Sequence, residues 1–353
     1  MKHLDIPICD SHLHVFWGGD VNKKTELIRE YIRRNNYGFV AVQAIPHGTL
    51  PSAPPHGPLE NAKCIYYKTQ LPDKVFAFAG FHHNPNPCDN TKEYYLEMAK
   101  FYMAAGYDGF KMIEDPLKNP LRKPYTNYDC EEYDLFFDYC EKEQIPVTIH
   151  TSGPEFSWDE GHTYHNAPLS FLDCYDVFRR LLSKHPNLRL SLAHFFFISG
   201  HIDVAAEFLD KYPNIYYDLT PNPFMYDDFA KNPKMWREFF IKYQDRILFG
   251  TDSGDNHDDI EFVHSDKLVY LVRTFLEGTE PFRIFDCDVA PINLDKSVLK
   301  KIYYDNIVKY LGRKTPVKAV TEYAKKELEG LLKSGYNFTQ EDLEDIEIMK
   351  KVF

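Results

Sequence analysis

The sequence predicts an α/β protein, a (β/α)8 TIM barrel with additional C-terminal helices. Short apolar segments alternate with amphipathic helical segments eight times along the 353-residue chain. Alternating units of this kind form a parallel sheet, and eight of them close into a barrel. A second observation agrees with this fold, because histidines and carboxylates recur at the C-terminal ends of the apolar segments. Barrels of this class carry their active sites at those ends.

The expected strands are short and show little alternation of apolar and polar residues, which is typical of strands buried on both faces. They span residues 6–15, 38–45, 75–81, 107–113, 145–150, 188–194, 214–219 and 246–252. A doubly wound open sheet is the rival architecture. Its dinucleotide-binding form is disfavoured because no Gly-x-Gly-x-x-Gly motif follows the first strand.

Amphipathic spacing predicts a helix after each strand. These helices are expected near residues 25–34, 60–71, 91–105, 130–143, 168–184, 201–211, 227–243 and 259–277. From about residue 295 onward the chain is expected to be helical again, and Thr339 with Asp342 can cap its last helix. We therefore expect the barrel over residues 1–312 and a helical extension over 313–353, which packs on the barrel or on a partner subunit.

The composition argues against several classes of protein. The net charge of −12 disfavours a nucleic-acid-binding surface, which needs clustered lysine and arginine. No apolar run reaches the roughly 18 residues of a membrane-spanning helix, and the N-terminus shows no signal-peptide core. The seven cysteines are scattered and include no Cys-x-x-Cys pair, which is typical of a reduced compartment. We expect a cytoplasmic protein that forms a homo-oligomer, by default a dimer.

Two histidines lie two residues apart at the end of the first strand. Side chains at positions i and i+2 of a strand point to the same face, so His12 and His14 can direct two imidazoles at one point. His150 and His194 end the fifth and sixth strands, and Asp252 ends the eighth. Imidazole and carboxylate groups on one rim are ligands that suit zinc or a similar divalent ion.

Each of these residues also has a simpler interpretation when taken alone. His150 or His194 could be a core histidine, and Asp252 could cap the following helix. Lys111, near the end of the fourth strand, could be an ordinary surface lysine, although its neighbours are apolar. Because all of them fall on the same rim, we interpret them together as a metal site.

Other polar residues on the same rim are weaker candidates. His82 and His83 follow the third strand and are expected either to contact a small-molecule substrate or to be solvated. Glu114 and Asp115 follow Lys111, and an acidic loop follows at 255–259. Asp218 ends the seventh strand and is expected to cap a helix, with contact to substrate as the alternative. The loop at 152–167 is long enough to be a lid.

The motifs at the strand ends resemble the signatures of the amidohydrolase superfamily. They read Asp-Ser-His-Leu-His (10–14), Gly-Phe-Lys (109–111), Ile-His-Thr (149–151), Leu-Ala-His (192–194) and Phe-Gly-Thr-Asp (249–252). The last of these, together with Tyr-Tyr-Asp-Asn-Ile-Val-Lys-Tyr-Leu-Gly (303–312), resembles the amidohydrolase-related branch. That branch also holds enzymes like aminocarboxymuconate-semialdehyde decarboxylase. The resemblance spans residues 5–312.

The resemblance implies a metal-ligand set. His12, His14 and Asp252 would bind one divalent ion, expected to be zinc, and His150 would join them in a mononuclear site. In a binuclear site, Lys111 would be carboxylated and would bridge two ions, with His150 and His194 on the second. A lysine on the fourth strand can instead contact substrate in this branch, and we favour one ion.

Two reactions fit such a site. The first is hydrolysis of an amide, ester or lactone bond of a small organic molecule by metal-activated water, with Asp252 as general base and the His194 N–H stabilising the oxyanion. The second is non-oxidative decarboxylation of a small aromatic or unsaturated acid. Decarboxylase-like members are expected to carry Asp-Tyr-Pro-Phe after the final metal ligand, and the sequence here is Asp-Ser-Gly-Asp (252–255). The hydrolase is therefore favoured, and a non-catalytic metal-binding barrel is disfavoured because the ligand set is intact.

Overall fold

The computed structural model describes most of the chain. The described residues are 5–15, 20–45, 59–84, 86–113, 128–151, 153–162, 164–167, 169–254 and 262–353. They include all eight segments that the sequence predicts to be strands.

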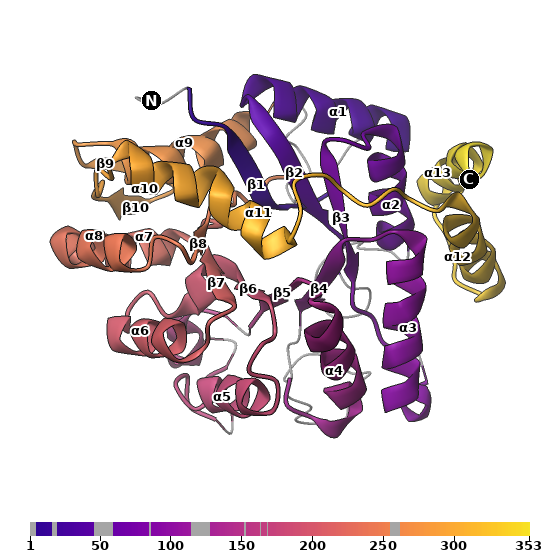
Figure 1. The fold of residues 1–353 in the computed structure, drawn as a ribbon, viewed down its shortest axis with the longest axis horizontal. Coiled ribbons are helices and arrows are strands. Elements are labelled where there is room, and N and C mark those ends of the chain that lie inside the picture. The colour runs from indigo at the N-terminus through magenta and orange to yellow at the C-terminus, as the bar shows by residue number, and fades with distance from the viewer. Residues whose placement is uncertain are drawn as a thin grey trace.

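Eight strands form one parallel sheet in the order in which they occur in the chain (Figure 1). They are β1 Ile8–Leu13, β2 Tyr37–Gln43, β3 Val75–Gly80, β4 Gly109–Ile113, β5 Val147–His150, β6 Leu190–Leu192, β7 Ile215–Asp218 and β8 Ile247–Leu248. The last strand returns to the first, because Ser11 N–H donates to the Phe249 carbonyl (3.0 Å) and Asp252 N–H donates to the His12 carbonyl (2.9 Å). The predicted (β/α)8 barrel is confirmed.

The chain just after β8 packs closely against β1, and Gly250 lies at this contact. A Cβ atom at Gly250 would lie 3.1 Å from Ser11 Oγ and 3.3 Å from His12 Cβ, closer than side chains normally pack. A side chain at 250 would make Ser11 and His12 shift by a few tenths of an ångström, at the strand that carries the first two predicted metal ligands.

Helices surround the strands on the outside of the barrel (Figure 1). They are α1 Val21–Arg34, α2 Glu60–Gln70, α3 Lys92–Ala105, α4 Asp134–Glu143, α5 Cys174–Lys184, α6 Ile202–Lys211, α7 Pro223–Lys231, α8 Pro233–Lys242 and α9 Val263–Glu277. The prediction of a single helix over 227–243 is wrong. The chain breaks at Asn232, because Pro233 lacks the N–H that would continue the first helix, and the Asn232 side chain caps the second by accepting from Met235 N–H (3.2 Å).

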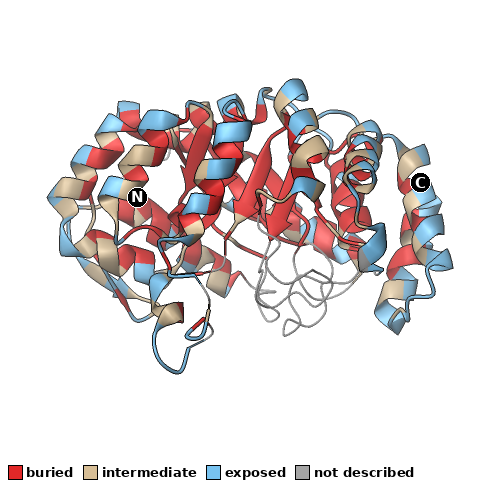
Figure 2. Cartoon of the chain, turned by 90° about the horizontal axis from the view of Figure 1, so that it is seen from below, coloured by how far each residue is buried: buried red, intermediate tan, exposed pale blue. Residues whose placement is uncertain are grey.

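The remaining elements follow α9. They are a hairpin that the sequence did not predict, β9 Phe282–Ile284 with β10 Cys287–Val289, and then α10 Lys296–Lys300, α11 Asn306–Leu311, α12 Thr321–Lys333 and α13 Gln340–Val352. Helix α11 fills one end of the barrel, where Ile307 and Tyr310 pack with the inward-facing aromatic rings of β2, β3 and β7. The Tyr310 hydroxyl hydrogen-bonds Thr148 Oγ1 on β5 (3.1 Å). This end is therefore a packed core, and Figure 2 shows the strands almost uniformly buried.

Helices α12 and α13 pack on the outside of the barrel, against α1, α2 and α3. Thr339 and Asp342 form the predicted capping box at the start of α13. Asp345 on α13 is fully buried. It accepts a hydrogen bond from Val21 N–H at the start of α1 (2.8 Å), and its carboxylate lies 3.1 Å from Lys63 Nζ on α2. A buried carboxylate thus joins the extension to two barrel helices.

Asp345→Ala should therefore release α13 from the barrel. The substitution leaves Lys63 and the end of α1 without their acceptor, and loss of one partner of a buried pair costs about 3 kcal/mol. We expect limited proteolysis to cleave the extension much faster than in the wild type. The variant Glu344→Ala, changed at an exposed neighbouring position, should be cleaved at the wild-type rate. Equal rates for Asp345→Ala and the wild type would show that the contact does not hold α13.

Candidate metal centre

His12 and His14 are both presented as neutral ligands with their Nε2 atoms free of protons. His12 Nδ1 lies 3.0 Å from Asp218 Oδ2, and His14 Nδ1 lies 2.8 Å from the Gln43 carbonyl. Both of these oxygens accept, so both Nδ1 atoms carry the ring proton. Burial, together with nearby Lys111, lowers the pKa of His12 to about 4. The two Nε2 lone pairs, 3.2 Å apart, therefore face each other.

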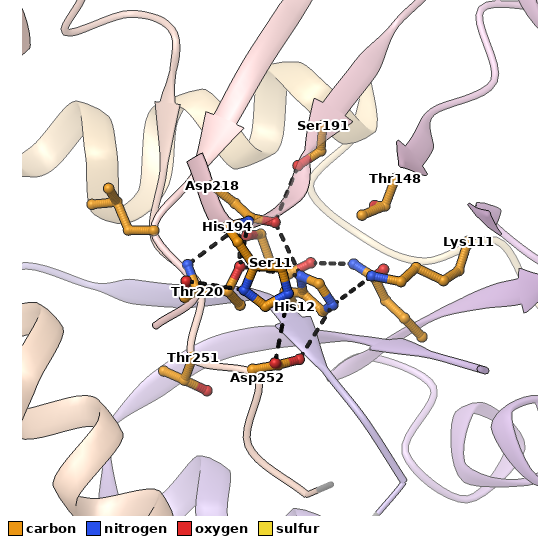
Figure 3. Close-up of polar contacts among 12 residues, drawn as sticks. Ser11, His12, Lys111, Thr148, Ser191, His194, Asp218, Thr220, Thr251 and Asp252 are labelled. Atoms are coloured by element: carbon orange, nitrogen blue, oxygen red, sulfur yellow. Dashed lines mark hydrogen bonds and ion pairs between the residues drawn. The ribbon is translucent and has the colours of Figure 1, made fainter. Parts of the chain in front are cut away.

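Asp252 brings a third acceptor to the same point. Its Oδ1 lies 3.1 Å from His14 Nε2. The same oxygen lies 3.5 Å from His12 Nε2 (Figure 3). Three converging lone pairs repel one another unless a cation lies among them. The donor atoms of this set fit a divalent metal ion of the zinc type, held by His12, His14 and Asp252.

Backbone strain positions Asp252 and His194. Asp252 has a φ of 61°, and the residues from His194 to Phe197 all have φ between 53° and 59°. A left-handed turn of non-glycine residues costs roughly 1–2 kcal/mol per residue. The turn directs the His194 side chain toward Asp252, with its Nε2 3.8 Å from Asp252 Oδ2. Strain of this kind is typical of functional sites.

Asp218 connects the two parts of the site. Besides the His12 ring, its carboxylate accepts from the His194 backbone N–H (2.9 Å) and from the Thr220 hydroxyl (Figure 3). Burial opposes ionisation, yet the nearby His12 ring and its hydrogen bond outweigh burial and lower the pKa of Asp218 to about 2. The expectation that Asp218 caps a helix is wrong, since Asn222 caps α7. Asp218 orients two predicted site residues instead.

A second buried carboxylate, that of Asp10, hydrogen-bonds the backbone of the segments that carry the candidate ligands. Asp10 accepts hydrogen bonds from the backbone N–H groups of His12 (3.1 Å) and Thr251 (3.2 Å) through Oδ1. Its Oδ2 accepts from the Thr251 hydroxyl (2.6 Å) and from Tyr31 (3.1 Å). This cluster ties the end of β1, which carries His12 and His14, to the segment that carries Asp252.

Lys111 lies in the same pocket of polar groups. Its side chain is buried, and Nζ lies 2.7 Å from His12 Nε2 (Figure 3). The interpretation of Lys111 as an ordinary surface residue is therefore wrong.

His150 lies beside His194 and outside the group formed by His12, His14 and Asp252. The two rings meet edge to face with centroids 4.9 Å apart, and His150 Nδ1 has no hydrogen-bond partner among the described residues. Burial lowers the pKa of both imidazoles, so both are neutral. His194 Nδ1 lies 3.3 Å from the Thr220 carbonyl, which can only accept. The proton is then on Nδ1, and Nε2 is an acceptor, contrary to the expectation that it donates to an oxyanion.

His82 and His83 point to a different part of the molecule. The His82 ring lies against Tyr102 on α3, with centroids 5.8 Å apart, and His83 Nδ1 hydrogen-bonds the Tyr95 hydroxyl (2.6 Å). Both histidines line a cavity outside the barrel. Their expected contact with substrate stays a prediction.

The remaining weaker candidates are only partly described. Glu114, Asp115 and the acidic loop at 255–259 lie outside the described residues. In the loop at 152–167, Tyr164 is buried and its ring packs at a tilt against Trp158, with ring centroids 4.6 Å apart. The role of this loop as a lid stays a prediction.

Among the described residues, no helix is both long enough and apolar enough to cross a bilayer.

Three comparisons with known proteins bear on this site. A model of the amidohydrolase family matches residues 9–313. No curated protein matches. The third comparison is with solved structures.

Several solved structures share the fold. An uncharacterized TIM-barrel protein from Bordetella bronchiseptica is 14% identical, with a TM-score of 0.56 over 88% of this chain and 99% of that one. A 2,6-dihydroxybenzoate decarboxylase is 14% identical, with a TM-score of 0.54 over 87% and 99%. A 4-oxalomesaconate hydratase from Rhodopseudomonas palustris is 15% identical, with a TM-score of 0.52 over 92% and 99%. At this identity the likeness concerns the fold alone.

Proposed function

Because this chain belongs to the amidohydrolase family, we propose that it is a metal-dependent hydrolase acting on an amide, ester or lactone bond of a small organic molecule. The observation that carries the proposal is the convergence of His12 Nε2, His14 Nε2 and Asp252 Oδ1 on one point. Both ring protons are held on Nδ1 by acceptors, so His12, His14 and Asp252 present three lone pairs, and the Lys111 ammonium lies beside them, 2.7 Å from His12 Nε2. Catalytic zinc sites use three protein ligands in this way and keep one position open.

Each residue around this point has its own role in the proposed hydrolysis. A bound divalent ion would supply a Lewis acid that makes water acidic enough to attack at neutral pH. Asp252 accepts the proton of the attacking water and later returns it to the leaving group. His194 Nε2, as an acceptor, orients the same water through a hydrogen bond. Lys111 provides a positive charge that attracts an anionic group of the substrate.

The fixed geometry of the site supports this assignment. Asp218 holds both the His12 ring and the His194 backbone, and Asp10 holds the backbone of His12 and Thr251. Groups that are positioned before the substrate arrives need little reorganisation during the reaction. The turn after Asp252 also departs from the Asp-Tyr-Pro-Phe expected of decarboxylase-like members.

A panel of amides, esters and lactones, assayed beside a panel of aromatic and unsaturated acids, tests the proposal. We expect turnover of at least one hydrolase substrate by the zinc-loaded protein and no release of carbon dioxide from the acids. Carbon dioxide release without any hydrolysis would overturn the proposal and would assign the alternative, a metal-dependent non-oxidative decarboxylase.

The number of ions is tested by replacing Lys111. Its Nζ donates to His12 Nε2 in this structure, and we propose that it contacts substrate and does not bridge two ions as a carbamate. Elemental analysis should then find about one equivalent of metal per chain in both the wild type and Lys111→Ala. About two equivalents in the wild type, falling to one or fewer in the variant, would contradict the mononuclear site.

A further inference from the structure

A second cavity lies outside the barrel, between α2, α3 and the C-terminal helix α12. Its volume is about 440 Å³, within the roughly 300–1,000 Å³ typical of small-molecule sites. Figure 1 shows α12 beside α2 and α3. Residues of α12 and of the turn that follows it line the cavity, and so do His82 and His83 after β3. The C-terminal extension therefore completes this cavity.

Two carboxyl groups are among the polar groups that line the cavity. Glu60 on α2 and Glu327 on α12 both line it, and no lysine or arginine is present among its described lining residues. Glu327 is on the side of α12 that carries the buried residues Ala324 and Leu328. Its carboxyl accepts a hydrogen bond from Tyr102 (3.2 Å) and lies 3.4 Å from the Tyr107 hydroxyl. The two tyrosines provide polar contacts but no positive charge.

This position is costly for a carboxylate. Burial raises the pKa of Glu327 to about 8, although the tyrosine hydrogen bonds oppose the shift. On the packed face of a helix and without a cation, the charged form of a carboxyl group has a higher free energy than it has in water. An incoming positive charge would offset that cost, and the same position would give a neutral ligand no such gain.

Aromatic rings supply the rest of the surface that a cation needs. Tyr94 and Tyr102 on α3, Tyr336 after α12 and the His82 ring all line the cavity. Tyrosine faces attract organic cations, and an aromatic wall beside a carboxylate is the arrangement that recognises substituted ammonium groups. We propose that this cavity binds a small organic ammonium ion, with its charge against Glu327 and its alkyl groups against the tyrosine rings.

Choline and its uncharged carbon isostere 3,3-dimethyl-1-butanol test this proposal, because the two differ in charge and hardly in shape. Each is titrated calorimetrically into the full-length, zinc-loaded protein, and the melting temperature is measured in parallel. We expect choline to bind at millimolar concentration and to raise the melting temperature. The isostere should bind at least about tenfold more weakly. Equal binding of the two compounds, or no binding of choline, would overturn the proposal.

A pair of variants locates the site. Glu327→Gln keeps the shape and the tyrosine contacts but cannot ionise when a cation binds, and should weaken choline binding about tenfold or more. Glu329→Gln removes a carboxylate from an exposed position of the same helix and should bind choline like the wild type. Unchanged affinity in Glu327→Gln would show that choline binds elsewhere and would refute the assignment of this cavity.

Discussion

Replacing Asp252 by asparagine should lower kcat/KM by about 10³-fold, within the range found when a general acid–base group is removed. The amide keeps the size of the side chain but cannot accept the proton of the attacking water, and it is a poorer metal ligand. Asp252 contributes its backbone N–H to the closure between β8 and β1, and this bond is retained. The melting temperature should therefore stay close to that of the wild type.

The control for Asp252→Asn is Asp203→Asn, the same chemical change at an exposed position of α6. It should leave both kcat/KM and the melting temperature unchanged. Both variants are assayed on a substrate that the wild type turns over. Retention of more than about a tenth of wild-type kcat/KM in Asp252→Asn would remove Asp252 from the proton transfer assigned to it.

Asp218→Asn should weaken metal binding by about 10- to 100-fold, although Asp218 is not itself among the grouped ligands. The wild-type carboxylate accepts from His12 Nδ1 and from the His194 backbone N–H at the same time. An asparagine keeps one acceptor oxygen and presents an N–H₂ group to the other donor. The His12 ring or the turn at His194 must then shift. Competition with a chelator measures the change in affinity directly, without an activity assay.

Ser191→Ala provides a graded control for the Asp218 variant. The Ser191 hydroxyl reaches Asp218 Oδ2 only at 3.5 Å, so its removal should change metal affinity by less than about threefold. An Asp218→Asn protein that binds metal as tightly as Ser191→Ala would show that Asp218 does not orient the ligands.

The barrel and the rim position of the site can be predicted from sequence because both depend on local patterns. Buried parallel strands are short apolar runs, and the polar residue that ends each run marks the functional rim. His12, His14 and Asp252 follow this rule, and the structure brings them together. The break at Asn232 can also be predicted from sequence, because Pro233 is a helix-breaking signal. The amphipathic spacing continues across this proline and by itself predicts a single helix.

Other parts of the site depend on contacts that no local pattern encodes. Asp218 bonds His12 from 206 positions away, and a carboxylate at a strand end looks the same whether it caps a helix or orients a ligand. The left-handed turn from His194 to Phe197 contains no glycine to reveal it. His82 and His83 lie just beyond the end of β3, where strand periodicity no longer decides which way a side chain points.

Metal content per chain tests the central claim most directly. We would measure it by elemental analysis after zinc supplementation and gel filtration, for the wild type, for His14→Ala and for His165→Ala, in which an exposed histidine is removed. The proposed site predicts about one equivalent in the wild type and in His165→Ala, and less than about a tenth of an equivalent in His14→Ala. A wild type without zinc, or a His14→Ala protein that retains it, would contradict a metal centre at His12, His14 and Asp252.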